Sequence, residues 1–209
     1  MQKLEHLIER YPVLDSVKTE ISEAYQILET CFASGHKLLI AGNGGSAADA
    51  DHIVGELMKG FVKKRAVSEI FAGELQAVDA DRGAVLSKTL QGGLPAIALH
   101  NHASLNTAVL NDIAGELMYA QQVNGYGVAG DVFLGISTSG NAANVYDAAV
   151  VAKAKGLKVI GLTGKDGGKL RSISDVAIVV PEQETYKIQE LHLPVYHALC
   201  LMLEERFFD

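Results

Sequence analysis

Five short apolar runs, each followed by a polar turn or a helical pattern, constrain the fold of this chain more than any other feature. They are residues 37–41, 94–99, 132–136, 157–162 and 176–180. A strand that is apolar along its whole length is buried on both faces, so such strands alternating with helices predict a parallel sheet between helical layers. We therefore expect an α/β fold with five parallel strands. In sheets of this kind, ligands bind at the carboxyl ends of the strands, where the polar turns lie.

Three segments lie outside this repeating pattern. Residues 1–34 have apolar side chains at helical spacing, and Pro12 is expected to divide them into two helices that pack on the sheet or on a partner subunit. Residues 66–93 are expected to form one or two short helices above the sheet. The last segment, residues 184–206, is expected to be a helix that Pro194 kinks or restarts.

Composition narrows the class of protein further. The chain has 209 residues and is 48% hydrophobic, enough for a single domain over 1–209 with a large core. Its net charge of −7 disfavours nucleic acid or an anionic membrane as a partner. The sequence shows neither a signal peptide nor an apolar run of about 18 residues that could span a membrane. Cys31 and Cys200 lack CxxC spacing and are expected to be buried thiols in a reducing, cytoplasmic setting.

The first polar turn, Gly42-Asn43-Gly44-Gly45-Ser46, joins a strand to a helix. Glycines let an anion approach the backbone, and a helix N-terminus presents free N–H groups to it. Gly42, Gly44 and Ala47 also fit a loose dinucleotide-binding pattern, but no acidic residue follows about 20 positions later. The remaining alternative is a tight turn without a ligand.

The second polar turn, Ser137-Thr138-Ser139-Gly140-Asn141, occupies the same position after another strand. Its hydroxyls and backbone N–H groups can surround a phosphate monoester. Two such turns together indicate a phosphorylated ligand held between them. No charge-neutralising set for phosphoryl transfer accompanies them, so the phosphate is expected to be bound and not transferred.

Polar side chains on two helices complete the candidate site. His52 and Glu56 are four residues apart on one helix face, a spacing that also suits an ordinary surface ion pair. The last helix contributes Gln189, Glu190, His192 and His197. Its histidines can be hydrogen-bonded core residues. Alternatively, a combined His/Glu/Gln/His set can bind Zn²⁺ or serve as a base and an acid.

These motifs, taken in order, resemble the phosphoheptose isomerases, a family with the SIS (sugar isomerase) fold. The resemblance runs from about Cys31 to the C-terminus through AGNGGSAADADHIVGEL, LND, GDVFLGISTSGNAANV, KVIGLTGKDGGKL and YKIQELHLPVYH. It implies a five-stranded parallel sheet flanked by helices, usually in a homotetramer whose neighbouring subunits share catalytic groups. It also implies conversion of sedoheptulose 7-phosphate to glycero-manno-heptose 7-phosphate.

The resemblance assigns a role to each candidate residue. Glu56 would be the base that moves a proton between C1 and C2, and His197 the acid. Sugar contacts would come from Asn43, Gly44, Gly45, Ser46, Asn111 and Asp112. Phosphate contacts would come from Ser137, Thr138 and Ser139. In several members Zn²⁺ sits at the positions that match His52, Glu56, Gln189 and His197.

The chain also departs from the family pattern. Ala142 stands where the phosphate cup often has another serine, and a basic residue that usually follows the His/Glu helix is replaced near Gly60. Residues 66–93 make a longer excursion than usual. Alternatives are an isomerase of another sugar phosphate, a sugar-phosphate sensor, and a non-catalytic SIS protein that regulates replication. The presence of Glu56 and His197 favours an enzyme.

Overall fold

The computed structural model describes residues 2–208, and its centre is the parallel sheet that the sequence predicts. The strands are β1 (Leu38–Gly42), β2 (Ala96–Ala98), β3 (Val132–Ser137), β4 (Lys158–Thr163) and β5 (Val176–Val179). Their order is β2-β1-β3-β4-β5, and every neighbouring pair is parallel. The expected α/β fold with five parallel strands is therefore confirmed.

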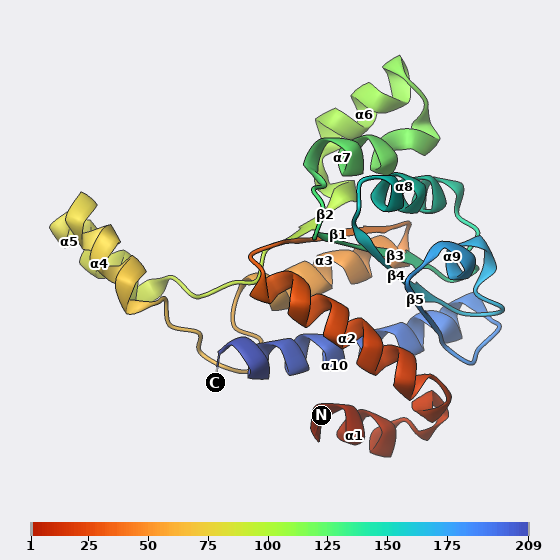
Figure 1. Cartoon of the computed structure of the whole chain (residues 1–209), viewed down its shortest axis with the longest axis horizontal. Helices are drawn as coiled ribbons and strands as arrows, with labels where there is room; N and C mark the ends of the chain where they lie inside the picture. Colours follow the sequence, from red (N-terminus) through yellow and green to blue (C-terminus); the bar gives the residue numbers. More distant parts are fainter. Residues whose placement is uncertain (1, 209) are drawn as a thin grey trace.

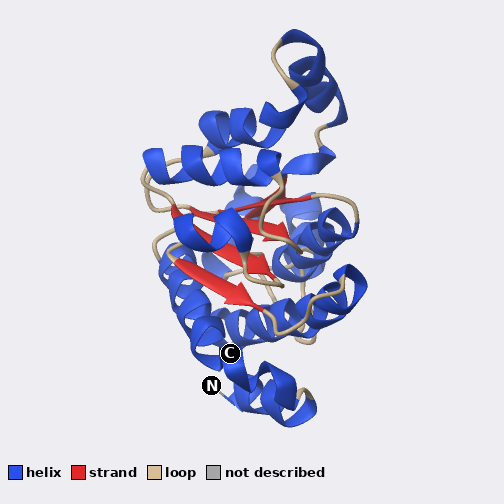
Figure 2. Ribbon diagram, turned by 90° about the vertical axis from the view of Figure 1, so that its right-hand side faces the viewer, coloured by secondary structure: helices blue, strands red, loops and turns tan. Residues whose placement is uncertain are grey.

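Helices cover both faces of this sheet (Figures 1 and 2). The N-terminal part contains α1 (Gln2–Arg10), the 3₁₀ helix η1 (Pro12–Val17), α2 (Lys18–Ala33) and α3 (Gly45–Met58). The middle contains α4 (Glu69–Val78), α5 (Ala80–Thr89), η2 (Leu99–Asn101), α6 (Ala103–Asp112), η3 (Gly115–Leu117) and α7 (Met118–Tyr126). The remainder contains α8 (Ala143–Ala154), α9 (Gly168–Ile173) and α10 (Thr185–Phe207).

Side chains alternate in direction along each strand, so the sheet separates two hydrophobic cores. Leu38 and Ile40 of β1 face a core formed with α1, α2, α3 and α10. Leu39 and Ala41 face the opposite core, which includes residues of α7, α8 and α9. Successive side chains of a strand point to opposite faces, which is why nearly every position of β1 and β3 is apolar.

The strand order places the two polar turns side by side. β1 pairs with β3 in register up to Gly42 and Ile136, so the turns that follow these strands emerge at the same edge. The chain then leaves toward opposite faces, since α3 after β1 packs in one core and α8 after β3 in the other. This is the switch point of an open α/β sheet, where a crevice forms.

The segment 66–93 forms two helices, as expected, but it does not lie above the sheet. α4 and α5 pack on each other, and Figure 1 shows them projecting away from the body of the molecule. Apolar side chains on this pair are exposed, including Ile70, Phe71 and Val78. Local periodicity predicts the two helices but not their direction, which depends on contacts with the rest of the chain.

Pro194 lies inside α10, which continues as one helix from Thr185 to Phe207. The expectation that this proline restarts the helix is therefore wrong. α10 is held along its length by α1, α2 and α3, and this packing offsets the one backbone hydrogen bond that proline cannot donate. The thiols of Cys31 and Cys200 are buried and free, as expected.

None of the helices formed by residues 2–208 is both long and apolar enough to cross a bilayer.

His192 on α10 is a core residue. Its side chain is 0% exposed, and its Nε2 lies 3.2 Å from the carbonyl oxygen of Thr163 in β4. Its Nδ1 is buried without a hydrogen-bond partner. Burial lowers the pKa of His192 to about 4, although the Thr163 carbonyl acts in the opposite direction.

We expect His192 to make the protein less stable in acid. An unfolded histidine with a pKa of 6.5 takes up a proton more readily than this buried one, whose pKa is about 4. Stability from the neutral ring is therefore complete above pH 6.5 and is lost as pH falls through 4, by up to about 3 kcal/mol. Urea unfolding at pH 7 and pH 4.5 should show a smaller loss in His192→Leu than in wild type. Equal losses in wild type, His192→Leu and the exposed control His6→Gln would contradict this.

Candidate active site

The glycine-rich turn after β1 is shaped by close backbone packing. Gly44 has φ of 55° and ψ of −120°, a conformation that favours glycine. A Cβ on Gly45 would lie 2.4 Å from Nε2 of Gln189, so the amide of Gln189 rests against the turn. Ser46 is buried, and its N–H donates to the carbonyl of Asn43 at 3.0 Å. The start of α3 and the N-terminal part of α10 are thereby brought into contact.

Hydrogen bonds join the first polar turn to the start of α8, the helix that follows the second turn. Asn43 and Asn144 exchange two amide hydrogen bonds, each 2.9 Å long. The hydroxyl of Tyr119 on α7 donates to the carbonyl of Gly42 at 2.6 Å and lies 3.4 Å from Oδ1 of Asn43. Burial raises the pKa of Tyr119 to about 12, so the hydroxyl stays a donor. Sequence reasoning missed Tyr119 and Asn144, although Asn144 stands close after the second turn.

The hydroxyl-rich turn after β3 packs on the loop after β4. Gly140 has φ of 67°, and a Cβ there would lie 1.8 Å from the carbonyl oxygen of Gly167. Ser137 is buried at the end of β3, whereas Thr138 and Ser139 are partly exposed. A pocket of about 420 Å³ lies beside this turn and is lined by Ser139, Asn141, Lys165, Asp166 and Gln183. Lys165 is a cation near the turn that sequence reasoning did not single out.

His52, Glu56 and His197 form the centre of the site. Nε2 of His52 lies 3.3 Å from Oε1 of Glu56, and 3.5 Å from Nε2 of His197. The first two residues come from α3 and the third from α10, two helices that pack on each other. The Glu56 side chain is only 13% exposed, and its other oxygen lies 3.5 Å from Nζ of Lys59. The helix spacing seen in the sequence therefore corresponds to a cluster, not an isolated surface pair.

A hydrogen-bond chain from Asp49 fixes the ring of His52. The hydroxyl of Tyr196 donates to Oδ1 of Asp49 at 3.3 Å, so it accepts a hydrogen bond from Nδ1 of His52 at 3.0 Å. His52 is then protonated on Nδ1, and its Nε2 faces Oε1 of Glu56 and Nε2 of His197. Sequence reasoning assigned no role to Asp49 or Tyr196, although both lie inside the strings that carry the family resemblance.

The surroundings of His197 favour its neutral form. Burial lowers the pKa of His197 below 6.5, the neighbouring ring of His52 lowers it further, and Glu56 acts in the opposite direction. The ring of Phe61 is centred 5.4 Å from that of His197.

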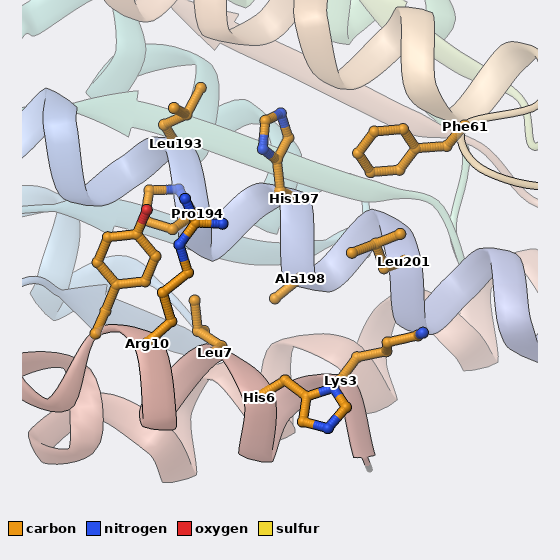
Figure 3. A pocket seen from close by; sticks show the side chains of 11 residues that line it. Lys3, His6, Leu7, Arg10, Phe61, Leu193, Pro194, His197, Ala198 and Leu201 are labelled. Atoms are coloured by element: carbon orange, nitrogen blue, oxygen red, sulfur yellow. The ribbon is translucent and has the colours of Figure 1, made fainter.

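His197 also borders a pocket of about 500 Å³ between α1 and α10 (Figure 3). In Figure 3 its ring points away from α1. None of the residues of the two polar turns lines this pocket. We therefore place the reaction centre on the side of His197 that faces His52.

The side chains of His52, Glu56 and His197 match a metal site only in part. Zn²⁺ held by nitrogen and oxygen at about 2.0–2.2 Å separates neighbouring ligand atoms by about 3.3–3.5 Å. The His52–Glu56 and His52–His197 distances match this in pairs. Across residues 2–208, however, no group of three or more His, Cys, Asp or Glu side chains is arranged to hold a metal ion. In this conformation the side chains fit an ion in pairs but do not form a complete coordination site.

Asn111 and Asp112 lie apart from the other candidate residues. They are exposed at the end of α6, where the amide of Asn111 donates to Oδ1 of Asp112 at 2.8 Å. Among the described residues, no hydrogen bond links either side chain to the two turns or to the His52 cluster. The described contacts therefore join Gln189 to the first turn and His52 to Glu56 and His197, whereas Asn111 and Asp112 lie outside this set.

Comparison with known proteins agrees with this geometry. Residues 68–164 match the SIS domain family model. The chain is 40% identical to the phosphoheptose isomerase of Nitratiruptor sp., over 98% of this chain and 95% of the relative. It is 38% identical to that of Aneurinibacillus thermoaerophilus, over 94% of this chain and 82% of the relative. The structure of phosphoheptose isomerase GmhA from Neisseria gonorrhoeae superposes with a TM-score of 0.73 at 32% identity, covering 96% of both chains.

We expect Tyr196→Phe to release the ring of His52. Without the hydroxyl, Nδ1–H loses its acceptor, and a hydrogen bond worth about 1 kcal/mol shifts the tautomer ratio about fivefold toward Nε2–H. Ring ¹⁵N shifts of chelator-treated protein measure this ratio. Tyr25→Phe on α2 is the matched control. A His52 ring that is already protonated on Nε2 in wild type would contradict the assigned chain.

Proposed function

The chain belongs to the phosphoheptose isomerase family and is a sugar-phosphate isomerase, and from this we propose that it converts sedoheptulose 7-phosphate to D-glycero-D-manno-heptose 7-phosphate. The observation that supports a catalytic role most is the cluster of His52, Glu56 and His197. It combines a carboxylate with a neutral imidazole beside two turns suited to a phosphorylated sugar.

In the proposed reaction, Glu56 and His197 move protons on opposite sides of an enediol. Glu56 removes the proton from C1 of the ketose while Nε2–H of His197 protonates the carbonyl oxygen on C2. His197 then takes the proton of the C1 hydroxyl, and Glu56 returns its proton to C2. The C1 carbonyl of the aldose results, with no net gain or loss of protons. A neutral His197 becomes an imidazolate after the first transfer and regains its proton in the second, so both residues end as they began.

The two turns are proposed to bind the rest of the substrate. Ser137, Thr138 and Ser139 would donate hydrogen bonds to the phosphate from the end of β3. Asn43, Gly44, Gly45, Ser46 and Gln189 would contact the sugar, with the Asn43–Asn144 amide pair fixing their distance from the phosphate. Asn111 and Asp112 are proposed to contact the sugar chain, which requires them to approach from α6 or from a neighbouring subunit.

Zn²⁺ is part of the proposal as a ligand of His52, Glu56, Gln189 and His197. Bound there, it would polarise the substrate oxygens as a Lewis acid. We also propose a homotetramer in the cytoplasm. Metal analysis of protein purified without chelator and sedimentation equilibrium test these two assignments separately from the reaction.

We expect Glu56→Gln and His197→Asn to lower kcat by about 10²–10⁴-fold, since each removes a proton-transfer group. Turnover of sedoheptulose 7-phosphate is followed by NMR, with zinc added and with zinc chelated. Glu190→Gln, an exposed site on α10, is the matched control and should keep wild-type turnover.

Hexose and pentose phosphates are included in the same assay. Turnover of one of these alone would assign a different substrate to the same site. Binding without turnover of any of them would replace the isomerase proposal with a binding protein.

A further inference from the structure

Arg65 and Glu204 form an ion pair that the proposed reaction does not use. Nε of Arg65 donates to Oε1 of Glu204 at 2.8 Å, and both side chains are 0% exposed. Arg65 lies in the linker after α3, and Glu204 lies near the end of α10. The ring of Phe208 packs over the guanidinium at 4.6 Å. The pair thus joins the two helices that supply the His52 cluster.

Arg65 caps the C-terminus of α3. Its Nη1 donates to the carbonyl of Leu57 at 2.7 Å, and its Nη2 donates to the carbonyl of Glu56 at 2.8 Å. The last carbonyls of a helix lack partners within the helix, and a cation is favourable beside them. The peptide unit of Glu56 is consequently fixed by the guanidinium, independently of its side chain.

Glu204 holds the linker that follows. Its oxygens accept hydrogen bonds from the backbone N–H groups of Phe61 at 2.8 Å and Val62 at 3.0 Å. Phe61 is the residue whose ring contacts His197. Burial raises the pKa of Glu204, but these hydrogen bonds and Arg65 outweigh it and lower the pKa, so the carboxylate stays charged.

A buried ion pair contributes little net stability compared with apolar side chains of similar size. Its geometric effect is more specific, because a guanidinium and a carboxylate fix several groups in defined directions. Here those groups are the carbonyl of Glu56 on one side and the backbone of Phe61 on the other. Both groups lie next to the proposed base and acid.

We propose that Arg65 and Glu204 are positioning residues that set the separation of Glu56 and His197. Arg65 acts through the backbone carbonyl of Glu56, and Glu204 acts on His197 through Phe61. This inference rests on the proposed roles of Glu56 and His197. It assigns the linker between α3 and α4 a part in the reaction without any contact with substrate.

The experiment compares Arg65→Met/Glu204→Leu with a matched double variant at a second ion pair. Lys37 and Asp131 pair at 2.6 Å near the start of β1 and β3, the opposite edge of the sheet, and Asp131 is also buried and accepts backbone N–H groups. Lys37→Met/Asp131→Leu therefore controls for loss of an ion pair whose carboxylate is buried and holds backbone N–H groups. Melting temperature, kcat and KM are measured for both, with kinetics well below the lower melting temperature.

Both double variants leave buried backbone groups without their side-chain partners, so both are expected to melt earlier. Only Arg65→Met/Glu204→Leu should lose kcat, by about 10- to 100-fold, with KM changed less than about threefold. Arg65→Lys keeps the charge but not the hydrogen bonds to both carbonyls, and its kcat should lie between those of this double variant and wild type. If the double variant does not fold, Arg65→Lys provides the test. A kcat within about twofold of the Lys37/Asp131 control would overturn the proposal.

A second measurement separates this inference from the proposed function. Ring NMR signals of His197 and amide exchange of Phe61 and Val62 report the geometry without any substrate. These signals should change in the Arg65 and Glu204 variants and not in the control. If wild type turns over no sugar phosphate, the proposed function fails, and these signals alone decide the inference. Unchanged signals would overturn it.

Discussion

The packing of α3 against α10 is the interaction on which the site depends. α3 supplies His52 and Glu56, and α10 supplies Gln189, Tyr196 and His197. Three contacts hold the helices along their length, and each uses a different chemistry. Gln189 rests on Gly45 at the start of α3, Tyr196 bonds Asp49 in the middle, and Glu204 binds Arg65 just beyond its end. A shift between the helices would disturb all three together.

Much of the fold could be predicted from the sequence because its strongest signals are local. Five continuous apolar runs define buried strands, and Pro12 divides the N-terminal helices as expected. The outcome at Pro194 and at residues 66–93 depended on tertiary packing. α10 continues through Pro194 because neighbouring helices pack against it. α4 and α5 project because nothing in the described chain covers them. Local patterns do not specify these outcomes.

The site could be predicted only where its residues belong to motifs. The two turns, the His52–Glu56 spacing and His197 were identified, and the structure brings them together. Asp49, Tyr119 and Tyr196 were missed because their roles come from contacts over long sequence separations. Arg65 was also missed, although its guanidinium reaches the end of α3 from a few residues beyond Gly60.

One hydroxyl orients the central ring of the site. Tyr196 donates to Asp49, so it accepts from Nδ1 of His52. Nε2 of His52 then faces Oε1 of Glu56 at 3.3 Å and Nε2 of His197 at 3.5 Å. Burial favours the neutral form of His197, so its ring can give a proton to a substrate oxygen and recover one within a single turnover. The carboxyl group behind Tyr196 thus fixes the ring that contacts both the proposed base and the proposed acid.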